Sequence, residues 1–173
     1  MDDNLRMLLA DQGSPEGLAR CIAENFAGMR VPTPLLDIAA AVGITSVSEV
    51  ASGFEGVLVT DAAKSKGAIS YNGSSSPERQ RFTIAHEIGH FLIPSHGANA
   101  QCLKADMGVI KTADARKVTE AQANDFASCL LMPRASYLAD IRKLGPPETE
   151  HILALHRRYE VSKEAAARRY ATL

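Results

Sequence analysis

The sequence contains few cysteines, and they form no paired motif. Cys21, Cys102 and Cys129 are the three cysteines among 173 residues; they lie far apart and none has C-x-x-C spacing. This pattern argues against a disulfide framework and against a zinc site made of cysteines. We therefore expect reduced thiols in a cytoplasmic protein.

The sequence also lacks an excess of charge and any long apolar run. A formal net charge of −1 gives no bulk electrostatic reason to bind nucleic acid or a membrane surface. No stretch approaches the roughly 18 apolar residues of a membrane span, and "MDDNLRMLLADQG" is acidic where a signal peptide is basic. With 46% apolar and 23% charged residues, we expect one globular domain over residues 1–173 and no membrane partner.

The order of local patterns predicts an α+β fold that is mainly helical and has a small antiparallel sheet. Ser14 before Pro15, and Ser162, are predicted helix N-caps, whereas Gly43 is a predicted C-terminal cap. The runs "ITSVSEV", "GFEGVLVT" and "KGAISYN" predict short strands, and residues 94–115 show no clear period. A helix is expected to begin near Ser76 and to carry the motif described next. Further helices are expected at about 14–27, 33–43, 117–131, 134–143, 148–158 and 162–172.

The stretch "RFTIAHEIGHFLI", residues 81–93, contains an H-E-x-x-H motif. Residues four apart share one face of a helix, so His86 and His90 can each direct a ring nitrogen to one zinc ion. Glu87 then lies beside the ion, where a base can take a proton from an attacking water. Gly89 leaves room for another backbone to approach. The spacing predicts an active-site helix with a catalytic metal.

Two residues compete for the third ligand position. His96 stands where the third histidine of H-E-x-x-H-x-x-G-x-x-H falls, but that pattern needs a glycine at position 93, and this sequence has Ile93 followed by Pro94. The alternative is Glu120 on a second helix, with Asn124 one turn later on the same face, placed to hydrogen-bond a ligand from behind. Glu120 could equally be an exposed glutamate near a helix N-terminus.

The two motifs together resemble the ImmA/IrrE family of metallopeptidases. Its patterns R-F-T-x-A-H-E-x-G-H and E-x-x-A-[ND]-x-F-A-x-x-L-L-M-P are filled at every fixed position, from Arg81 to His90 and from Glu120 to Pro133. The resemblance implies a gluzincin-like centre in which His86, His90 and Glu120 bind Zn²⁺ and Glu87 is the catalytic base, with Mn²⁺ or Fe²⁺ as other metals. Asn124 stands where thermolysin-like relatives carry Asp.

The resemblance also implies a protein substrate, a repressor of the XRE helix-turn-helix type, whose cleavage releases stress or mobile-element genes. DNA would then be involved only through that repressor. An extended substrate is expected to pair with an edge strand near "AISYN". Candidates for stabilising the oxyanion are Tyr71, His96, Tyr137 and His151.

Two other functions stay open on the sequence alone. A metal-binding regulator could sequester a repressor without cleaving it, although an intact Glu87 favours catalysis. Residues 148–173 could instead form a helix-turn-helix extension that contacts DNA through Arg157, Arg158, Arg168 and Arg169. The near-neutral net charge favours a solvated helix face over DNA binding.

Overall fold

The computed structural model describes residues 3–51, 53–97, 99–102 and 115–173. Three helices begin the chain: α1 (Asp3–Ala10), α2 (Pro15–Asn25) and α3 (Leu35–Val42). The Ser14 side chain accepts a hydrogen bond from the Gly17 amide and caps α2, as predicted. Gly43 ends α3 at φ 112°, a left-handed conformation that favours glycine. Helix α1 was not predicted from the sequence.

The strands form one mixed sheet in the order β1-β3-β2-β4. Its members are β1 (Ile44–Val50), β2 (Gly56–Thr60), β3 (Gly67–Asn72) and β4 (Asn99–Cys102). Strand β2 pairs antiparallel with both β3 and β4, whereas β1 pairs parallel with β3. The prediction of an antiparallel sheet is therefore wrong for the β1–β3 pair.

The stretch "AISYN" lies in β3, which has strands on both sides. The expectation that a substrate pairs with this stretch is therefore wrong, because its backbone groups are already used within the sheet. Among the described residues, β1 and β4 form the two edges. Strand β4 was not predicted; it lies in the segment 94–115, of which residues 98 and 103–114 are outside the described part of the chain.

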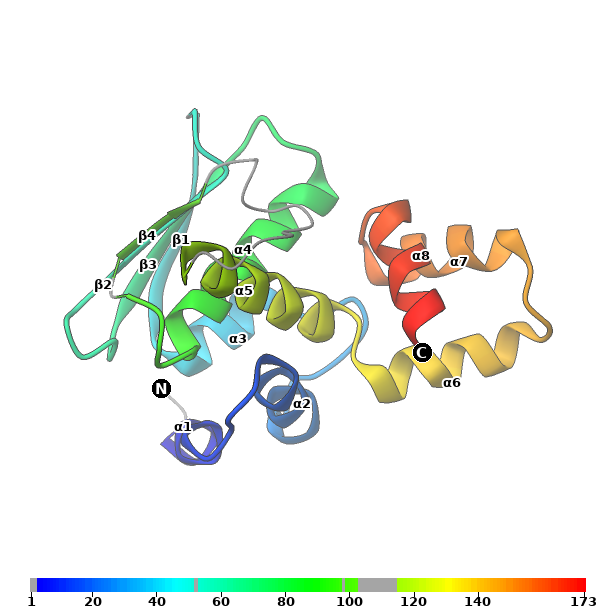
Figure 1. Ribbon diagram of the computed structural model, residues 1–173, viewed down its shortest axis with the longest axis horizontal. Coiled ribbons are helices and arrows are strands. Elements are labelled where there is room, and N and C mark those ends of the chain that lie inside the picture. Colours follow the sequence, from blue (N-terminus) through cyan, green and yellow to red (C-terminus); the bar gives the residue numbers. More distant parts are fainter. Residues whose placement is uncertain (1–2, 52, 98, 103–114) are drawn as a thin grey trace.

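Two long helices carry the two motifs: one packs on the sheet and the second packs along the first. Helix α4 (Pro77–Leu92) contacts β2 and β3 and also packs along α5 (Ala115–Leu131). Figure 1 shows the sheet on one side of the molecule, with α4 and α5 next to it. Helix α5 also contacts α2, so its apolar residues are enclosed. The fully buried side chains at this junction include Ile22, Leu58, Ile69, Ile88, Phe126 and Leu130.

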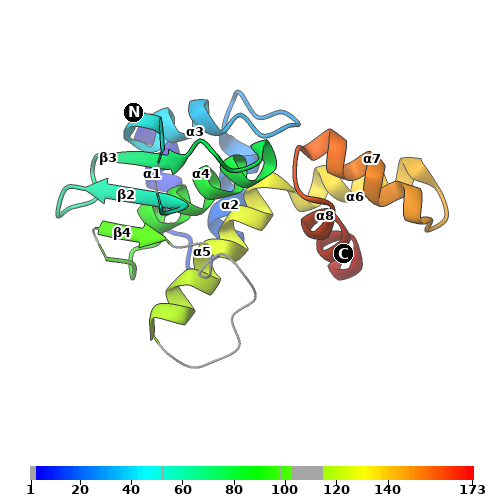
Figure 2. The same cartoon turned by 90° about the horizontal axis from the view of Figure 1, so that it is seen from above.

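The last three helices form a group at the end of the molecule away from the sheet, as Figures 1 and 2 both show. They are α6 (Arg134–Leu144), α7 (Thr149–Tyr159) and α8 (Lys163–Thr172). The buried Asp140 carboxylate accepts hydrogen bonds from Tyr159, Lys143 and Arg158 and joins α6 to α7. Ser162 caps α8 by accepting from the Ala165 amide, as predicted.

Two arginines connect this group to the rest of the chain. Arg81 on α4 donates to the Thr33 carbonyl (2.9 Å) and pairs with Glu160 (3.3 Å), and Arg169 donates to the Met132 carbonyl. The arginines considered for DNA binding are partly used in this way. Arg169 donates to the Met132 carbonyl, Arg158 pairs with Asp140, and Arg168 pairs with Glu164.

Cys21 and Cys129 are free thiols, and burial raises the pKa of both. Within the described residues, no helix combines the length and apolar character that crossing a membrane requires.

Candidate metal centre

Helix α4 brings His86, Glu87 and His90 into the interior. Ser76 caps the helix by accepting from the Arg79 amide, Pro77 occupies its first turn, and the residues from Thr83 to Phe91 are buried. The three polar side chains are between 0% and 3% exposed. Burying polar side chains costs free energy unless other groups or ions interact with them. The neighbours of these three residues therefore matter.

Helix α5 places Glu120 against the two histidines. Its carboxylate oxygens lie 3.2 Å from His86 Nε2 and 3.5 Å from His90 Nε2, and the two Nε2 atoms are 3.0 Å apart. Among the described residues, His86, His90 and Glu120 form a buried cluster of groups able to hold a metal ion. Glu120 is thus not an exposed helix-terminal glutamate.

The spacing of these three donors fits a divalent ion. Two ligands of a tetrahedral zinc, each about 2.0–2.1 Å from the ion, are about 3.3 Å apart, and the separations here are 3.0, 3.2 and 3.5 Å. Two imidazoles and one carboxylate are also the donor set of many catalytic zinc sites. The residues present therefore match a divalent metal in both chemistry and geometry.

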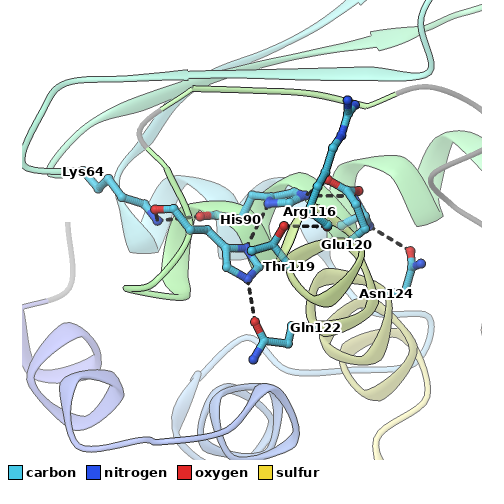
Figure 3. A network of polar contacts seen from close by, with 9 residues as sticks. Lys64, His90, Arg116, Thr119, Glu120, Gln122 and Asn124 are labelled. Atoms are coloured by element: carbon cyan, nitrogen blue, oxygen red, sulfur yellow. Dashed lines mark hydrogen bonds and ion pairs between the residues drawn. The ribbon is translucent and has the colours of Figure 1, made fainter. Parts of the chain in front are cut away.

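Asn124 orients the first histidine. Its Oδ1 lies 3.0 Å from His86 Nδ1, and an amide oxygen can only accept, so Nδ1 carries the proton. His86 Nε2 then presents a lone pair toward His90 and Glu120. Figure 3 shows Asn124 and Glu120 on α5, with Asn124 joined by its hydrogen bond to the neighbouring ring. A convergence of lone pairs and a carboxylate is stabilised by a cation between them.

Charge in the centre follows from burial and from contacts between the ligands. Burial lowers the pKa of His86 below 6.5, which keeps the ring neutral near pH 7. Burial alone would raise the pKa of Glu120, but the contacts with His86 and His90 outweigh burial and bring the pKa to about 2. Both groups therefore carry the protonation state that a metal needs.

Glu87, which follows His86 on α4, is fully buried and faces β2. A methyl group at Gly56 would lie 2.4 Å from Glu87 Oε1 and 2.6 Å from Thr83 Cγ2. The absence of a side chain at position 56 makes the space that the carboxylate occupies. Gly56 was not identified from the sequence, although a glycine at the start of a strand can signal such a close approach.

Gly89 performs a similar role between α4 and α5, with a different neighbour from the one expected. A methyl group there would meet the Phe126 ring at 2.9 Å, so the approaching group is a side chain rather than a backbone. Phe126 is fully buried. The small residue allows the two helices that carry the metal donors to lie close together.

His96 lies on the far side of His90 from the donor cluster. Its Nδ1 is 2.9 Å from His90 Nδ1, whereas the donor cluster is at His90 Nε2. The backbone explains this position, because Ile93 leaves α4 in an extended conformation (φ −75°, ψ 116°) and makes no glycine turn. Burial lowers the pKa of His96 to about 4. The His96 side chain is buried.

The other candidates for oxyanion stabilisation lie in different surroundings. The Tyr137 hydroxyl donates to the Ala166 carbonyl among the last three helices, and His151 contacts the Tyr170 hydroxyl in the same group. Tyr71 is half-buried on β3 and pairs with Gly56, next to the site of Glu87.

Lys64 and Gln122 also contact the site, and sequence reasoning missed both. Lys64 Nζ donates to the carbonyls of His90 (2.6 Å), Ile93 (2.8 Å) and His96 (3.3 Å), which end α4 and begin the next loop. Gln122 Oε1 lies 3.0 Å from His96 Nε2. Figure 3 shows Lys64 and Gln122 reaching this region from different elements. Neither residue has a motif spacing that could have revealed it.

A groove of about 1020 Å³ adjoins the centre. Phe82 and Asn124, which both contact the His86 ring, lie on its wall, and further residues of α2, α4, α5 and α8 line the remainder. The groove therefore extends from the metal helices to the last helix of the chain.

Comparison with known proteins agrees with this geometry. The chain is 34% identical over 96 residues to the radiation response metalloprotease IrrE of Deinococcus radiodurans. That alignment covers 55% of this chain and 28% of the relative, so the chain spans well under half of that protein's length. The sequence model of a peptidase family, described as the IrrE N-terminal-like domain, matches residues 41–170, which include both motif helices. The chain belongs to this family of IrrE N-terminal-like peptidases.

Proposed function

We propose that the protein is a zinc-dependent endopeptidase that cleaves a transcriptional repressor of the XRE helix-turn-helix type. The observation that carries the proposal is the convergence of His86, His90 and Glu120 into one buried donor cluster. The fully buried Glu87 follows His86 directly on the same helix. Family membership and the similarity to a named metalloprotease support the reaction class.

In this proposal each residue has a separate task. A bound divalent ion would supply Lewis acidity, which acidifies water and polarises a carbonyl. Glu87 would accept the proton of the attacking water and later donate it to the leaving amine. His86, His90 and Glu120 would hold the ion, and Asn124 would keep His86 in the required tautomer. Zinc is favoured because two imidazoles and one carboxylate suit it, although Mn²⁺ and Fe²⁺ also accept such ligands.

The proposed substrate is a polypeptide bound along the sheet and the adjoining groove. Strand β4 has one side on β2, and no described strand covers its other side. An extended peptide could add to that edge through backbone hydrogen bonds. The groove between α5 and α8 offers further space next to Asn124. The repressor class itself rests on the family resemblance, and so does a role in stress or mobile-element regulation.

The last helices are proposed to belong to the same domain and to help hold the partner. Their arginines are used in part to contact Asp140, Glu164 and the Met132 carbonyl, which reduces the charge available for DNA. Binding of DNA would then occur only through the repressor. Free thiols at Cys21 and Cys129 suit the reducing cytoplasm, where such a partner would be found.

The proposal is tested by incubating the zinc-loaded protein with a helix-turn-helix repressor of the XRE type from the same organism, with and without a chelator. Glu87→Gln keeps the shape of the side chain but cannot act as a base. We expect it to bind zinc normally and to lose about 10²- to 10⁴-fold in cleavage rate, the usual contribution of a general base. Glu24→Gln makes the same change at an exposed position of α2 and should cleave normally.

Mass spectrometry of the products identifies the cut bond, and a peptide library provides a second substrate. Cleavage that survives the chelator, or full activity of Glu87→Gln, would refute the mechanism. Zinc binding with tight repressor association but no cleavage of either substrate would instead identify a non-proteolytic regulator.

A further inference from the structure

His90 is part of a chain of contacts that ends on α5. The His90 ring nitrogen Nδ1 lies 2.9 Å from Nδ1 of His96, and Nε2 of His96 lies 3.0 Å from Oε1 of Gln122. His96 is 4% exposed, so water does not substitute freely for either contact. These contacts lie behind His90, on the side away from Glu120.

The donor and the acceptor of each contact can be assigned by starting from Gln122. Gln122 Oε1 can only accept, so His96 Nε2 carries a proton and donates it. In a neutral imidazole the other nitrogen is then an acceptor, so His96 Nδ1 must accept from His90 Nδ1. His90 is therefore protonated at Nδ1, and its Nε2 presents a lone pair to the donor cluster.

The backbone of His96, like its ring, makes hydrogen bonds to other parts of the fold. Lys64 Nζ donates to the His96 carbonyl (3.3 Å) and to the His90 carbonyl (2.6 Å), and the His96 amide donates to the Ile93 carbonyl. The hairpin between β2 and β3 thus fixes the loop after α4. The position of His96 relative to His90 is set by the fold and not by chance orientation of a surface loop.

We propose that His96, through Gln122, is a positioning residue that fixes the tautomer and ring orientation of His90 for metal binding. This inference rests on the metal site proposed above. Helix α5 would then control both histidines, because Asn124 orients His86 directly and Gln122 orients His90 through His96. The same helix supplies Glu120, so correct docking of one element prepares all three donors together.

The test measures zinc affinity by competition with a chromophoric chelator. His96→Leu removes the acceptor for His90 Nδ1 and should weaken zinc binding about 10- to 100-fold, the usual effect of losing an outer partner of a ligand histidine. His96→Asn keeps an oxygen close to the position of Nδ1 and should restore most of the affinity. Gln122→Leu leaves His96 free to change tautomer and should give an intermediate loss.

His151→Leu is the matched control. His151 is also a buried histidine, 5% exposed, and contacts the Tyr170 hydroxyl far from the centre. This variant should lose stability but keep the wild-type zinc affinity, which separates loss of a buried polar contact from loss of metal positioning. Long-range ¹H–¹⁵N spectra of the metal-free protein give a second readout. His90 should be a single Nδ1-protonated tautomer in the wild type and a mixture in His96→Leu.

The outcomes separate this inference from the proposed function. A wild-type protein that does not bind zinc would refute the metal site itself. A folded His96→Leu variant with wild-type zinc affinity would refute the role of His96 while leaving the metal site intact. If His96→Leu does not fold, wild-type affinity and an unchanged His90 spectrum in Gln122→Leu would refute it instead.

Discussion

The carboxylate of Glu87 lies directly against the backbone of Gly56, so closely that a methyl group on Gly56 would come within 2.4 Å of Glu87 Oε1. A glycine on one strand thus determines where the proposed base of a neighbouring helix can lie. The contact is fixed on both sides, because Gly56 is paired with Tyr71 in the sheet and Glu87 is fully buried on α4.

Gly56→Ala should impair catalysis by displacing Glu87. The added methyl group also meets Thr83 Cγ2 at 2.6 Å, so neither neighbour can move away easily in this buried position. We expect a loss of about 1–3 kcal/mol in the free energy of unfolding, as for other overpacked sites. Cleavage should fall strongly while zinc affinity stays near the wild-type value, as measured by kinetics and chelator competition.

Gly53→Ala is the control for the same chemical change in the same region. A methyl group at Gly53 meets nothing within 4 Å, so this variant should retain activity and stability. Equal activity of the two alanine variants would show that the position of Glu87 does not depend on the space at Gly56.

Removal of the Glu120 charge should strongly reduce metal-dependent stabilisation. Zinc at about 100 times its dissociation constant should raise the free energy of unfolding of the wild type by about 2.7 kcal/mol, because it binds only the folded state. Glu120→Gln has lost the carboxylate donor and should show a much smaller rise at the same zinc concentration. Thermal unfolding with and without chelator measures the difference.

The corresponding control is Glu150→Gln, at an exposed glutamate in the first turn of α7. It should respond to zinc like the wild type. A full zinc response in Glu120→Gln would exclude Glu120 as a ligand and would reopen the choice of the third donor.

Lys64→Met should destabilise the end of α4. The substitution keeps most of the aliphatic length but removes three donations to the carbonyls of His90, Ile93 and His96. Hydrogen bonds from a charged group contribute about 1.5–3 kcal/mol each in favourable cases, and we expect a total loss of about 2–3 kcal/mol. Urea unfolding measures it, and the exposed neighbour Lys66 provides the comparison. A loss no greater than that of Lys66→Met would contradict this role.

Asp140 should make stability depend on pH in acid. Burial acts to raise the pKa of its carboxyl, but hydrogen bonds from Arg158, Tyr159 and Lys143 outweigh burial and hold the pKa below 3.8. The folded state thus favours the ionised form, so the stabilisation is present in full above the unfolded pKa near 3.8. It is lost as pH falls through the lower pKa of the folded protein.

Asp140→Asn isolates this effect. At neutral pH we expect a loss of about 1–3 kcal/mol, because the buried Tyr159 hydroxyl and the half-exposed Arg158 guanidinium lose a charged acceptor. The difference between wild type and variant should be constant from neutral pH to about pH 5 and should shrink in stronger acid. A difference that stays constant through the acid range would show that ionisation of Asp140 is not the source.

The sequence was most informative where local chemistry alone decides structure. Strand β1 was predicted with its observed bounds, and Ser14 and Ser162 were identified as N-caps because a serine before a helix can satisfy a free amide. Spacing placed His86 and His90 on one face of α4. The choice between His96 and Glu120 could not be made from spacing, because it depends on how α5 docks against α4.

The features that were missed depend on the path of the chain in space. Alternation of residues shows which side of a strand is buried but not which strand it pairs with, so the parallel β1–β3 pair was not foreseen. Gly56 lay within the predicted strand run "GFEGVLVT", where a glycine can signal a close approach but does not identify the group that approaches. Lys64, Gln122 and His96 come from three separate segments, and their contacts exist only in the folded protein.

The division of the donors between α4 and α5 has a further consequence for the folding of the chain. His90 and Glu120 are about thirty positions apart, so an ion held by both would close a loop in the way that a covalent crosslink does. In the chain-entropy treatment of crosslinks, a loop of this length restricts the unfolded ensemble by about 3–4 kcal/mol. Metal availability would therefore affect the lifetime of the folded protein in a cell as well as its activity.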